Sequence, residues 1–232
     1  VAGSESLFGQ EYFNHSFFGV QFRLPSYGSF GISVEDFSVD YSGNSLSKET
    51  SIGLHQGITL SSDRNSTISF GYGIKNYTVD YGSTAGVTGD GSDGIDLGSQ
   101  SSLGIDIGLL ASLADRIRFG AKAFNINSPT LGDANSAVRL PQRAQVGIAF
   151  SPYDLVWTTA ALTKSTGHAS HFHGGMSYHI LDNIFLRAGV MTNPNRFATG
   201  FEVLVKKIRI NYAFMTHPVL PLSHQISVEV VR

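Results

Sequence analysis

Five basic side chains in the second half of the sequence fall on the polar face of segments that alternate between polar and apolar residues. Only two acidic residues, Asp106 and Glu202, lie near them on that face. Basic groups that line one wall of a cavity create a positive potential there, which attracts anions. The spacing therefore predicts a positive charge stripe for an anionic headgroup or an acidic plug, consisting of Arg118, Lys122, Arg187, Lys206 and Arg209.

Two histidines have the side chains of a transition-metal site. His171 and His173 lie two residues apart, so in a strand both imidazoles point to one side and could share a zinc or copper ion. No carboxylate in the adjacent sequence completes such a site. The alternative is that both histidines are hydrated lumen residues.

One loop has the oxygen-bearing side chains of a calcium site. Residues 89–96 read Gly-Asp-Gly-Ser-Asp-Gly-Ile-Asp, which places Asp90, Asp93 and Asp96 close together in the chain. Calcium takes carboxylate and carbonyl oxygens from such segments, but the glutamate that closes an EF-hand loop is missing. The alternative is a flexible, solvated loop that binds no ion.

The sequence contains no catalytic motif. It has no Gly-x-Ser-x-Gly elbow, no His-Glu-x-x-His pair and no P-loop, and its lack of cysteine rules out a thiolate metal site or a disulfide. The formal net charge of −2 gives no reason to expect nucleic acid as a partner. We therefore expect neither enzymatic activity nor a cofactor.

Strands must position these side chains, because apolar and polar residues alternate along most of the chain. The alternation is clearest at 18–24, 52–60, 68–75 and 172–180. Since successive strand side chains point to opposite faces, this pattern predicts a sheet with one apolar and one polar face. We expect strands near 16–24, 29–41, 49–61, 66–81, 101–113, 115–127, 142–151, 154–164, 168–180, 183–192, 196–206, 207–216 and 223–231, with residues 1–14 ambiguous.

So many consecutive strands predict one all-β domain over residues 1–232, an antiparallel transmembrane β-barrel of about 14 strands (12–14). Short turns alternate with long connections at 42–48, 82–100 and 128–140, which is typical of such barrels. Charged residues are only 15% of the chain, against a usual ~25%. The alternative is a soluble β-sandwich, but a closed barrel this large has a lumen too wide for apolar side chains to fill.

The apolar face should therefore meet lipid and the polar face should line a glycine-rich lumen. The alternation slips near 35–37 and 75–81, which indicates bulges or strands that extend past the membrane. Trp157 and other aromatic residues near strand ends are expected at the membrane interfaces. The positions expected to face lipid are Phe18, Val20, Phe22, Ile52, Leu54, Ile68, Phe70, Tyr72, Ile105, Ile107, Ile184, Leu186 and Ala188.

Four segments, 119–132, 140–152, 186–201 and 208–228, resemble barrels of the FadL/PorV-like outer-membrane superfamily. The last hairpin is the most similar, through Tyr212, Ala213, Phe214, His217, Pro218, Leu220, His224, Ile226 and Ser227. The superfamily includes long-chain fatty-acid transporters and PorV-like components of type IX secretion. Its members usually begin with a plug segment, which residues 1–232 do not contain, either because it lies outside them or because this branch lacks it. Such barrels often end in an aromatic residue, whereas the sequence here ends in Arg232.

The resemblance implies a non-enzymatic barrel in the outer membrane of a Gram-negative-type envelope, acting in transport or secretion. It further implies the lipid bilayer as surroundings, a protein partner in an envelope complex, and a hydrophobic or anionic ligand. The alternative is an anchoring barrel that holds a surface or periplasmic partner without passing solute. The sequence names no substrate.

Overall fold

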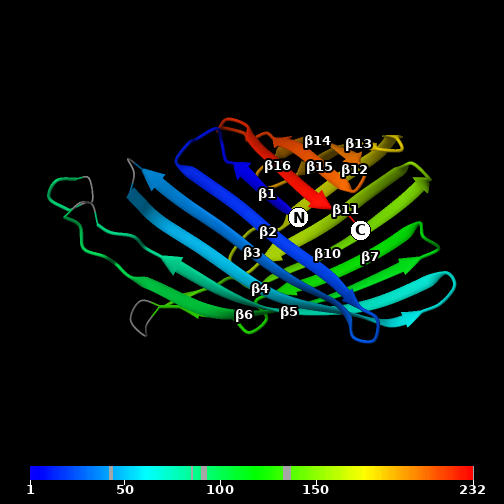
Figure 1. Ribbon diagram of the computed structural model, residues 1–232, viewed down its shortest axis with the longest axis horizontal. Helices are drawn as coiled ribbons and strands as arrows, with labels where there is room; N and C mark the ends of the chain where they lie inside the picture. Colours follow the sequence, from blue (N-terminus) through cyan, green and yellow to red (C-terminus); the bar gives the residue numbers. More distant parts are fainter. Residues whose placement is uncertain (42–43, 85, 90–92, 133–136, 232) are drawn as a thin grey trace.

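The computed structural model describes residues 1–41, 44–84, 86–89, 93–132 and 137–231, and its main body is a closed antiparallel β-barrel (Figure 1). Going around the barrel, β1 pairs with β16 and β2, which closes the sheet. No helix of the described residues is long and apolar enough to span a membrane. The barrel strands are β1 (Ala2–Ser6), β2 (Phe13–Leu24), β3 (Gly28–Tyr41), β4 (Asn44–Ser62), β5 (Ser66–Asp80), β6 (Ser99–Leu113), β7 (Ile117–Phe124), β10 (Arg143–Tyr153), β11 (Val156–Ser165), β12 (His171–Leu181), β13 (Ile184–Met191), β14 (Arg196–Val205), β15 (Ile208–Met215) and β16 (Ser223–Val230).

These strands confirm the all-β barrel predicted from the alternation. The segment left ambiguous at the start of the chain contributes β1, a strand of only 5 residues. The Val1 amino group donates to the Gly19 carbonyl at 2.8 Å, and the Gly19 N–H donates to the Val1 carbonyl at 2.8 Å. These two bonds join the start of the chain to β2, and the pairing of β1 with β16 hydrogen-bonds the other side of β1.

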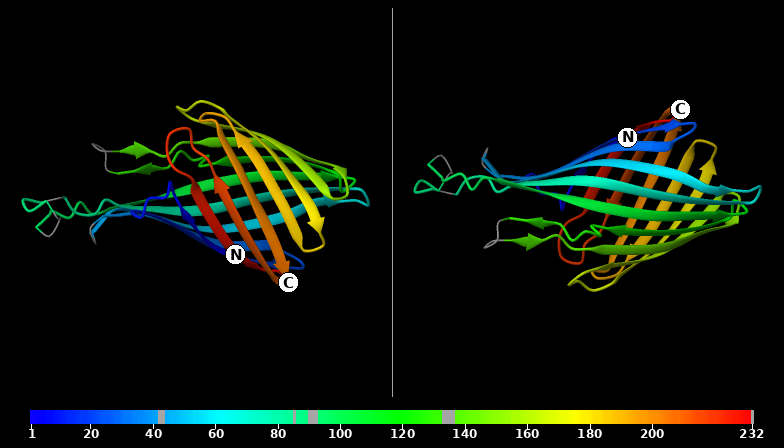
Figure 2. Two further views of the ribbon diagram at one scale, coloured as in Figure 1. Left: turned by 90° about the horizontal axis from the view of Figure 1, so that it is seen from above. Right: turned by 90° about the horizontal axis from the view of Figure 1, so that it is seen from below.

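The two ends of the barrel differ in their connections (Figure 2). At one end, the turn rim, strands join through short turns such as 63–65 and 206–207. At the other end, the loop rim, the connections include 81–98 and 125–142, and the second of these carries the two-stranded β8 (Thr130–Leu131) and β9 (Val138–Arg139). This asymmetry agrees with the short turns and long loops expected of an outer-membrane barrel.

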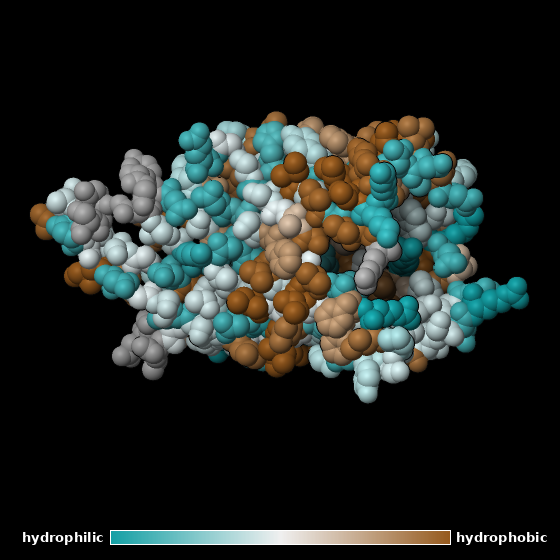
Figure 3. All heavy atoms as spheres, in the orientation of Figure 1, coloured by the Kyte–Doolittle hydropathy of each residue, from teal (hydrophilic) through white to brown (hydrophobic). Residues whose placement is uncertain are grey.

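Apolar side chains cover the outside of the barrel instead of packing in a core. Phe18 is 51% exposed, Leu54 61% and Leu186 45%, and Leu131 is the only buried hydrophobic residue among those described. Brown side chains gather over the middle of the visible face, with hydrophilic ones toward both ends (Figure 3). A soluble sandwich would bury these groups, so this surface requires lipid around it.

On β5 the alternation inverts near the loop rim without a bulge in its pairing with β6. The pairing of β5 with β6 is continuous from Ser66 to Asp80. Tyr77 and Val79 therefore share the inner face with Gly71 and Gly73, whereas Thr78 and Asp80 point outward. The continuous pairing excludes a bulge between β5 and β6 as the cause of this slip, and the extension of β5 past the membrane stays a prediction.

Candidate functional site

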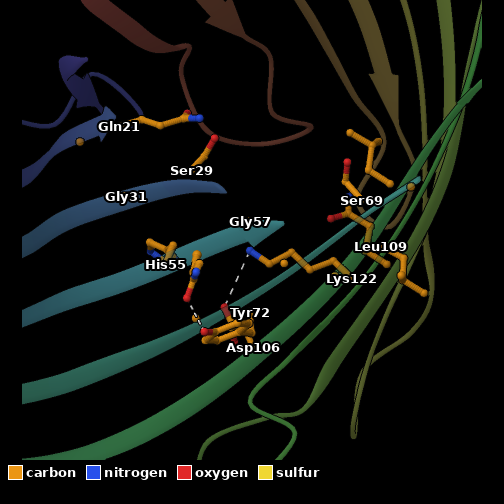
Figure 4. A pocket seen from close by; sticks show the side chains of 18 of the residues that line it. Gln21, Ser29, Gly31, His55, Gly57, Ser69, Tyr72, Asp106, Leu109 and Lys122 are labelled. Atoms are coloured by element: carbon orange, nitrogen blue, oxygen red, sulfur yellow. Dashed lines mark hydrogen bonds and ion pairs between the residues drawn. The ribbon is translucent and has the colours of Figure 1, made fainter. Parts of the chain in front are cut away.

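The lumen contains a cavity of about 1370 Å³ that reaches from the β1–β2 seam across to β11. Part of its wall, which we call the glycine floor, consists of Gly57, Gly71 and Gly108. These three residues stand directly opposite one another on β4, β5 and β6. Lys122 on β7 continues the same row, and it lies beside the floor together with Asp106 (Figure 4).

Glycine on this floor leaves space that a side chain would occupy. A Cβ built at Gly57 meets no atom within 4 Å, and one at Gly71 or Gly108 comes no closer than 3.5 Å to a neighbouring carbonyl oxygen. The fold thus does not force glycine at these positions. Because these three residues are glycines, this part of the lumen wall consists of backbone atoms and leaves the lumen wide.

At positions 53 and 73, in contrast, a neighbouring side chain leaves no room for anything larger than glycine. His55 lies between them on the lumen wall, and a Cβ at Gly53 would come within 2.6 Å of its Nε2. A Cβ at Gly73 would clash with its Nδ1. Ser33 Oγ lies 2.8 Å from His55 Nε2 and fixes the ring. The histidine therefore lies flat on the wall instead of crossing the cavity.

A buried carboxylate organises the first charged group on the lumen wall. The Asp106 side chain is only 3% exposed, and its Oδ2 lies 3.5 Å from Lys75 Nζ and 3.8 Å from Lys122 Nζ. Its Oδ1 accepts a 3.0 Å hydrogen bond from the Asn125 N–H. Asn125 has a φ of 55°, which turns the chain at the end of β7 so that its N–H can reach Asp106.

Aromatic rings hold the neighbouring cations. Lys122 Nζ and the Arg143 guanidinium lie 4.0 and 3.9 Å from the centre of the Phe124 ring. The Arg118 guanidinium lies 4.4 Å from the ring of Trp157. Such contacts are attractive because the face of an aromatic ring is electron-rich.

A second charged group lies on the other side of the barrel, on β13 to β16. Glu202 has a side chain only 4% exposed, and it pairs with Arg187 and, at 2.9 Å, with Arg209. Arg209 also pairs with Glu229 at 2.8 Å. The four charges alternate in sign from strand to strand. A smaller cavity of about 470 Å³ lies beside this group.

The predicted charge stripe is thus divided in space. Arg118 and Lys122 lie on β7, whereas Arg187 and Arg209 belong to the second charged group, with β10, β11 and β12 between them. Lys206 lies in the turn between β14 and β15 and is exposed. The role proposed for the five residues stays a prediction, but a role for Arg187 and Arg209 would require them to leave their carboxylate partners.

Trp157 differs from its predicted place at a membrane interface. It shares a face of β11 with Thr159 and Ala161, which line the large cavity. Its contact with Arg118 agrees with this position inside the lumen. The sequence alternation alone could have placed Trp157 in the lumen, because it lies two residues from Thr159 and four from Ala161, and such residues of a strand share a face.

Three lumen residues outside the predicted stripe also matter. Lys75 pairs with Asp106, and Arg143 lies over the Phe124 ring, so each shares a contact group with Lys122. His15 lies between Glu5 and Glu35, with ring nitrogens 3.0 and 3.2 Å from their carboxylate oxygens. Alternation places each of these side chains on the polar face, but only strand pairing brings them together.

The metal candidates have other contacts. His171 Nδ1 lies 3.3 Å from the Thr192 carbonyl oxygen. Asp96 Oδ1 accepts a hydrogen bond from the Gly98 N–H. Asp90 lies outside the described residues, and those described contain no group of three ligand side chains placed to hold a metal. Both metal sites stay predictions.

Asp93 stabilises its own loop. Its carboxylate accepts hydrogen bonds from the Thr88 hydroxyl at 2.7 Å and from the Val87 N–H at 3.1 Å. The hydrogen bond from the Thr88 hydroxyl is the main reason that the pKa of Asp93 is lowered. A calcium ion at Asp93 would have to replace these bonds.

Charge on the lumen wall should set ion preference. Among the described residues, Arg118 and Arg143 each stack on a ring and pair with no carboxylate. Replacing both by glutamine is expected to lower the chloride-to-potassium permeability ratio about threefold, since a shift of roughly one kT per ion is within the range of such fields. The reversal potential in planar bilayers under a salt gradient measures this ratio. An unchanged potential would show that neither charge faces the permeation path.

The fold resembles several solved outer-membrane proteins. The toluene transporter TodX of Pseudomonas putida superposes with a TM-score of 0.59 at 12% identity, covering 98% of this chain and 86% of that chain. A Pseudomonas aeruginosa FadL homologue gives 0.55 at 14% identity, covering 93% and 77%. CdiB from Acinetobacter baumannii gives 0.51 at 9% identity, covering 94% and 50%.

Comparison with protein-family models and with curated proteins finds no match. The structural likenesses are therefore the basis for placing this chain among known proteins, and at such identities they concern the fold. They confirm the predicted fold, a closed antiparallel β-barrel of the kind found in outer-membrane proteins.

Proposed function

We propose that this protein is a passive outer-membrane channel that takes a hydrophobic or amphipathic solute into its lumen. The observation that carries the proposal is the cavity of about 1370 Å³ inside a closed barrel, with a glycine floor that the fold does not require. A barrel that served only as an anchor would gain stability from side chains at those positions, because glycine weakens a strand.

The inner face near the loop rim supports an apolar solute. Phe13 and Phe37 stack there with ring centres 6.0 Å apart, and Tyr77 and Val79 lie on the inner face of β5. An apolar solute that leaves water at this rim gains from burial before it reaches the cavity. TodX is described as a toluene transporter and a monoaromatic hydrocarbon channel, which is consistent with this solute class.

Filling the glycine floor tests the proposal. Gly57→Leu places a side chain in open space, so we expect normal barrel assembly together with a loss of solute uptake of about tenfold or more, since the side chain narrows the lumen where the wall is smooth. The measurement is uptake of a monoaromatic hydrocarbon into liposomes that contain the purified barrel.

The matched control is Ala188→Leu, which also introduces a leucine, here on the lipid-facing side of β13 beside Met176. Uptake in this variant should equal that of the unsubstituted protein. If Gly57→Leu transports normally while the barrel is folded, the cavity is not the path and the channel proposal is wrong.

An anchoring or PorV-like role in a secretion assembly is the second candidate, and one observation favours it. The connection 81–98 at the loop rim carries exposed apolar side chains, with Val87 98%, Ile95 74% and Leu97 56% exposed. Exposed apolar groups grouped in one place are typical of partner surfaces. A protein that co-purifies from native membranes and is lost in an Ile95→Ser, Leu97→Ser variant would favour this candidate.

A further inference from the structure

We propose that Lys75, Lys122 and Arg143 form a binding site for a divalent oxyanion, namely inorganic phosphate or the phosphate group of a monoester. The three side chains come from β5, β7 and β10 and converge on the lumen wall between the glycine floor and the loop rim. The site stands on its own contacts and does not depend on which solute the channel passes.

Two groups bring the cations together: Asp106 pairs with both lysines, and the Phe124 ring contacts all three cations. Lys75 and Lys122 both lie within 3.8 Å of one oxygen atom, Oδ2 of Asp106. All three cations lie over the Phe124 ring, at 5.7 Å for Lys75, 4.0 Å for Lys122 and 3.9 Å for Arg143. Like charges repel at this range, so their convergence needs a compensating anion.

Asp106 compensates only part of this charge. Asp106 pairs with Lys75 and Lys122, and no carboxylate of the described residues pairs with Arg143, which leaves a formal excess of two positive charges. Glu202, by contrast, lies in a group in which two acids balance two arginines. An excess of two charges on a partly desolvated wall favours a divalent anion over chloride or a single carboxylate.

The lysine protons are also available to a further acceptor. Asp106 Oδ2 is buried and makes no hydrogen bond to any described residue, because the ammonium groups stand at ion-pair distance. The Lys122 side chain is 43% exposed, so its remaining donors can reach the lumen. Two ammonium groups and one planar guanidinium match the three terminal oxygens of a phosphate.

Inorganic phosphate tests the site directly. We expect the purified barrel in detergent to bind phosphate in isothermal titration calorimetry, with sulfate competing and with chloride and acetate failing to compete. Arg143→Gln should weaken phosphate binding by about tenfold or more, because a charge-assisted contact is lost. Arg143 is exposed at the start of β10, so this variant should fold normally.

Arg118→Gln is the matched control, since Arg118 is a lumen arginine stacked on Trp157 instead of Phe124. It should bind phosphate as the unsubstituted protein does. A second variant, Lys75→Gln, should reproduce the loss seen with Arg143→Gln. Equal weakening in Arg118→Gln, competition by chloride or acetate, or no phosphate binding at all would overturn the proposal.

Glycerol 3-phosphate separates the two sources of the phosphate group. Equal affinity for inorganic phosphate and glycerol 3-phosphate, lost together in Arg143→Gln, supports a site that reads the phosphate alone. Tighter binding of the ester, lost in the same variant, supports an organic phosphate as the occupant. If solute uptake fails in Gly57→Leu but phosphate binding remains, the oxyanion site is separate from the apolar path.

Discussion

Glu202→Ala is expected to lower the free energy of unfolding by roughly 1–3 kcal/mol, because two partly exposed arginines lose their charged hydrogen-bond acceptor. Glu202 is almost completely buried on β14 and lies between two arginines from neighbouring strands. Without it, Arg187 and Arg209 face each other with one acid, Glu229, left to pair with Arg209. Unfolding in urea from lipid vesicles, followed by tryptophan fluorescence, measures the change.

Glu229→Ala is the control for this prediction. The Glu229 side chain is 38% exposed and pairs only with Arg209 among the described residues, so its loss should cost less than about 1 kcal/mol. Equal costs for the two variants would show that burial does not set the contribution of Glu202.

Leu186→Arg should lower the free energy of unfolding by roughly 2–4 kcal/mol if its depth is near the bilayer midplane. Leu186 lies on the outer face of β13, between Tyr178 of β12 and Phe201 of β14, and is 45% exposed. An arginine there must leave water for hydrocarbon. The same unfolding measurement in vesicles tests the expectation.

Thr78→Arg is the matched control, because Thr78 points outward from β5 beyond the apolar belt. This substitution should change stability by less than about 0.5 kcal/mol. A neutral Leu186→Arg variant would mean that the outer face of β13 meets water and that the barrel orientation is wrong.

Local pattern predicted the strands and their faces, because the direction of a strand side chain depends only on its position in the alternation. The apolar outer surface and the polar position of Gly57, Gly71 and Gly108 follow from it. The short strand β1 escaped this reasoning, since 5 residues with serine and glycine carry little alternation. Its place in the barrel depends on pairing with β2 and β16.

Pairing between strands is the information that the sequence pattern lacks. Lys75 and Arg143 are 68 positions apart, and they share Phe124 only because β5, β6, β7 and β10 are neighbours in the barrel. Because the alternation does not show which strands are neighbours, it could not distinguish one continuous charge stripe from two separate charged groups. Arg187 and Arg209 have lumen positions by alternation, but Glu202 balances them across strands.

The inversion of the alternation on β5 sets the order of environments along the barrel axis. A bilayer presents a polar surface first and hydrocarbon in the middle, whereas the inner wall near the loop rim carries the rings of Phe37 and Tyr77 among the charges of Glu49, His15 and Glu35, ahead of Asp106 and its lysines. The free-energy profile for an apolar solute inside the barrel is therefore displaced relative to that of the surrounding membrane. An apolar group at the outer mouth of the barrel would therefore contact aromatic rings at a depth where the surrounding bilayer presents headgroups.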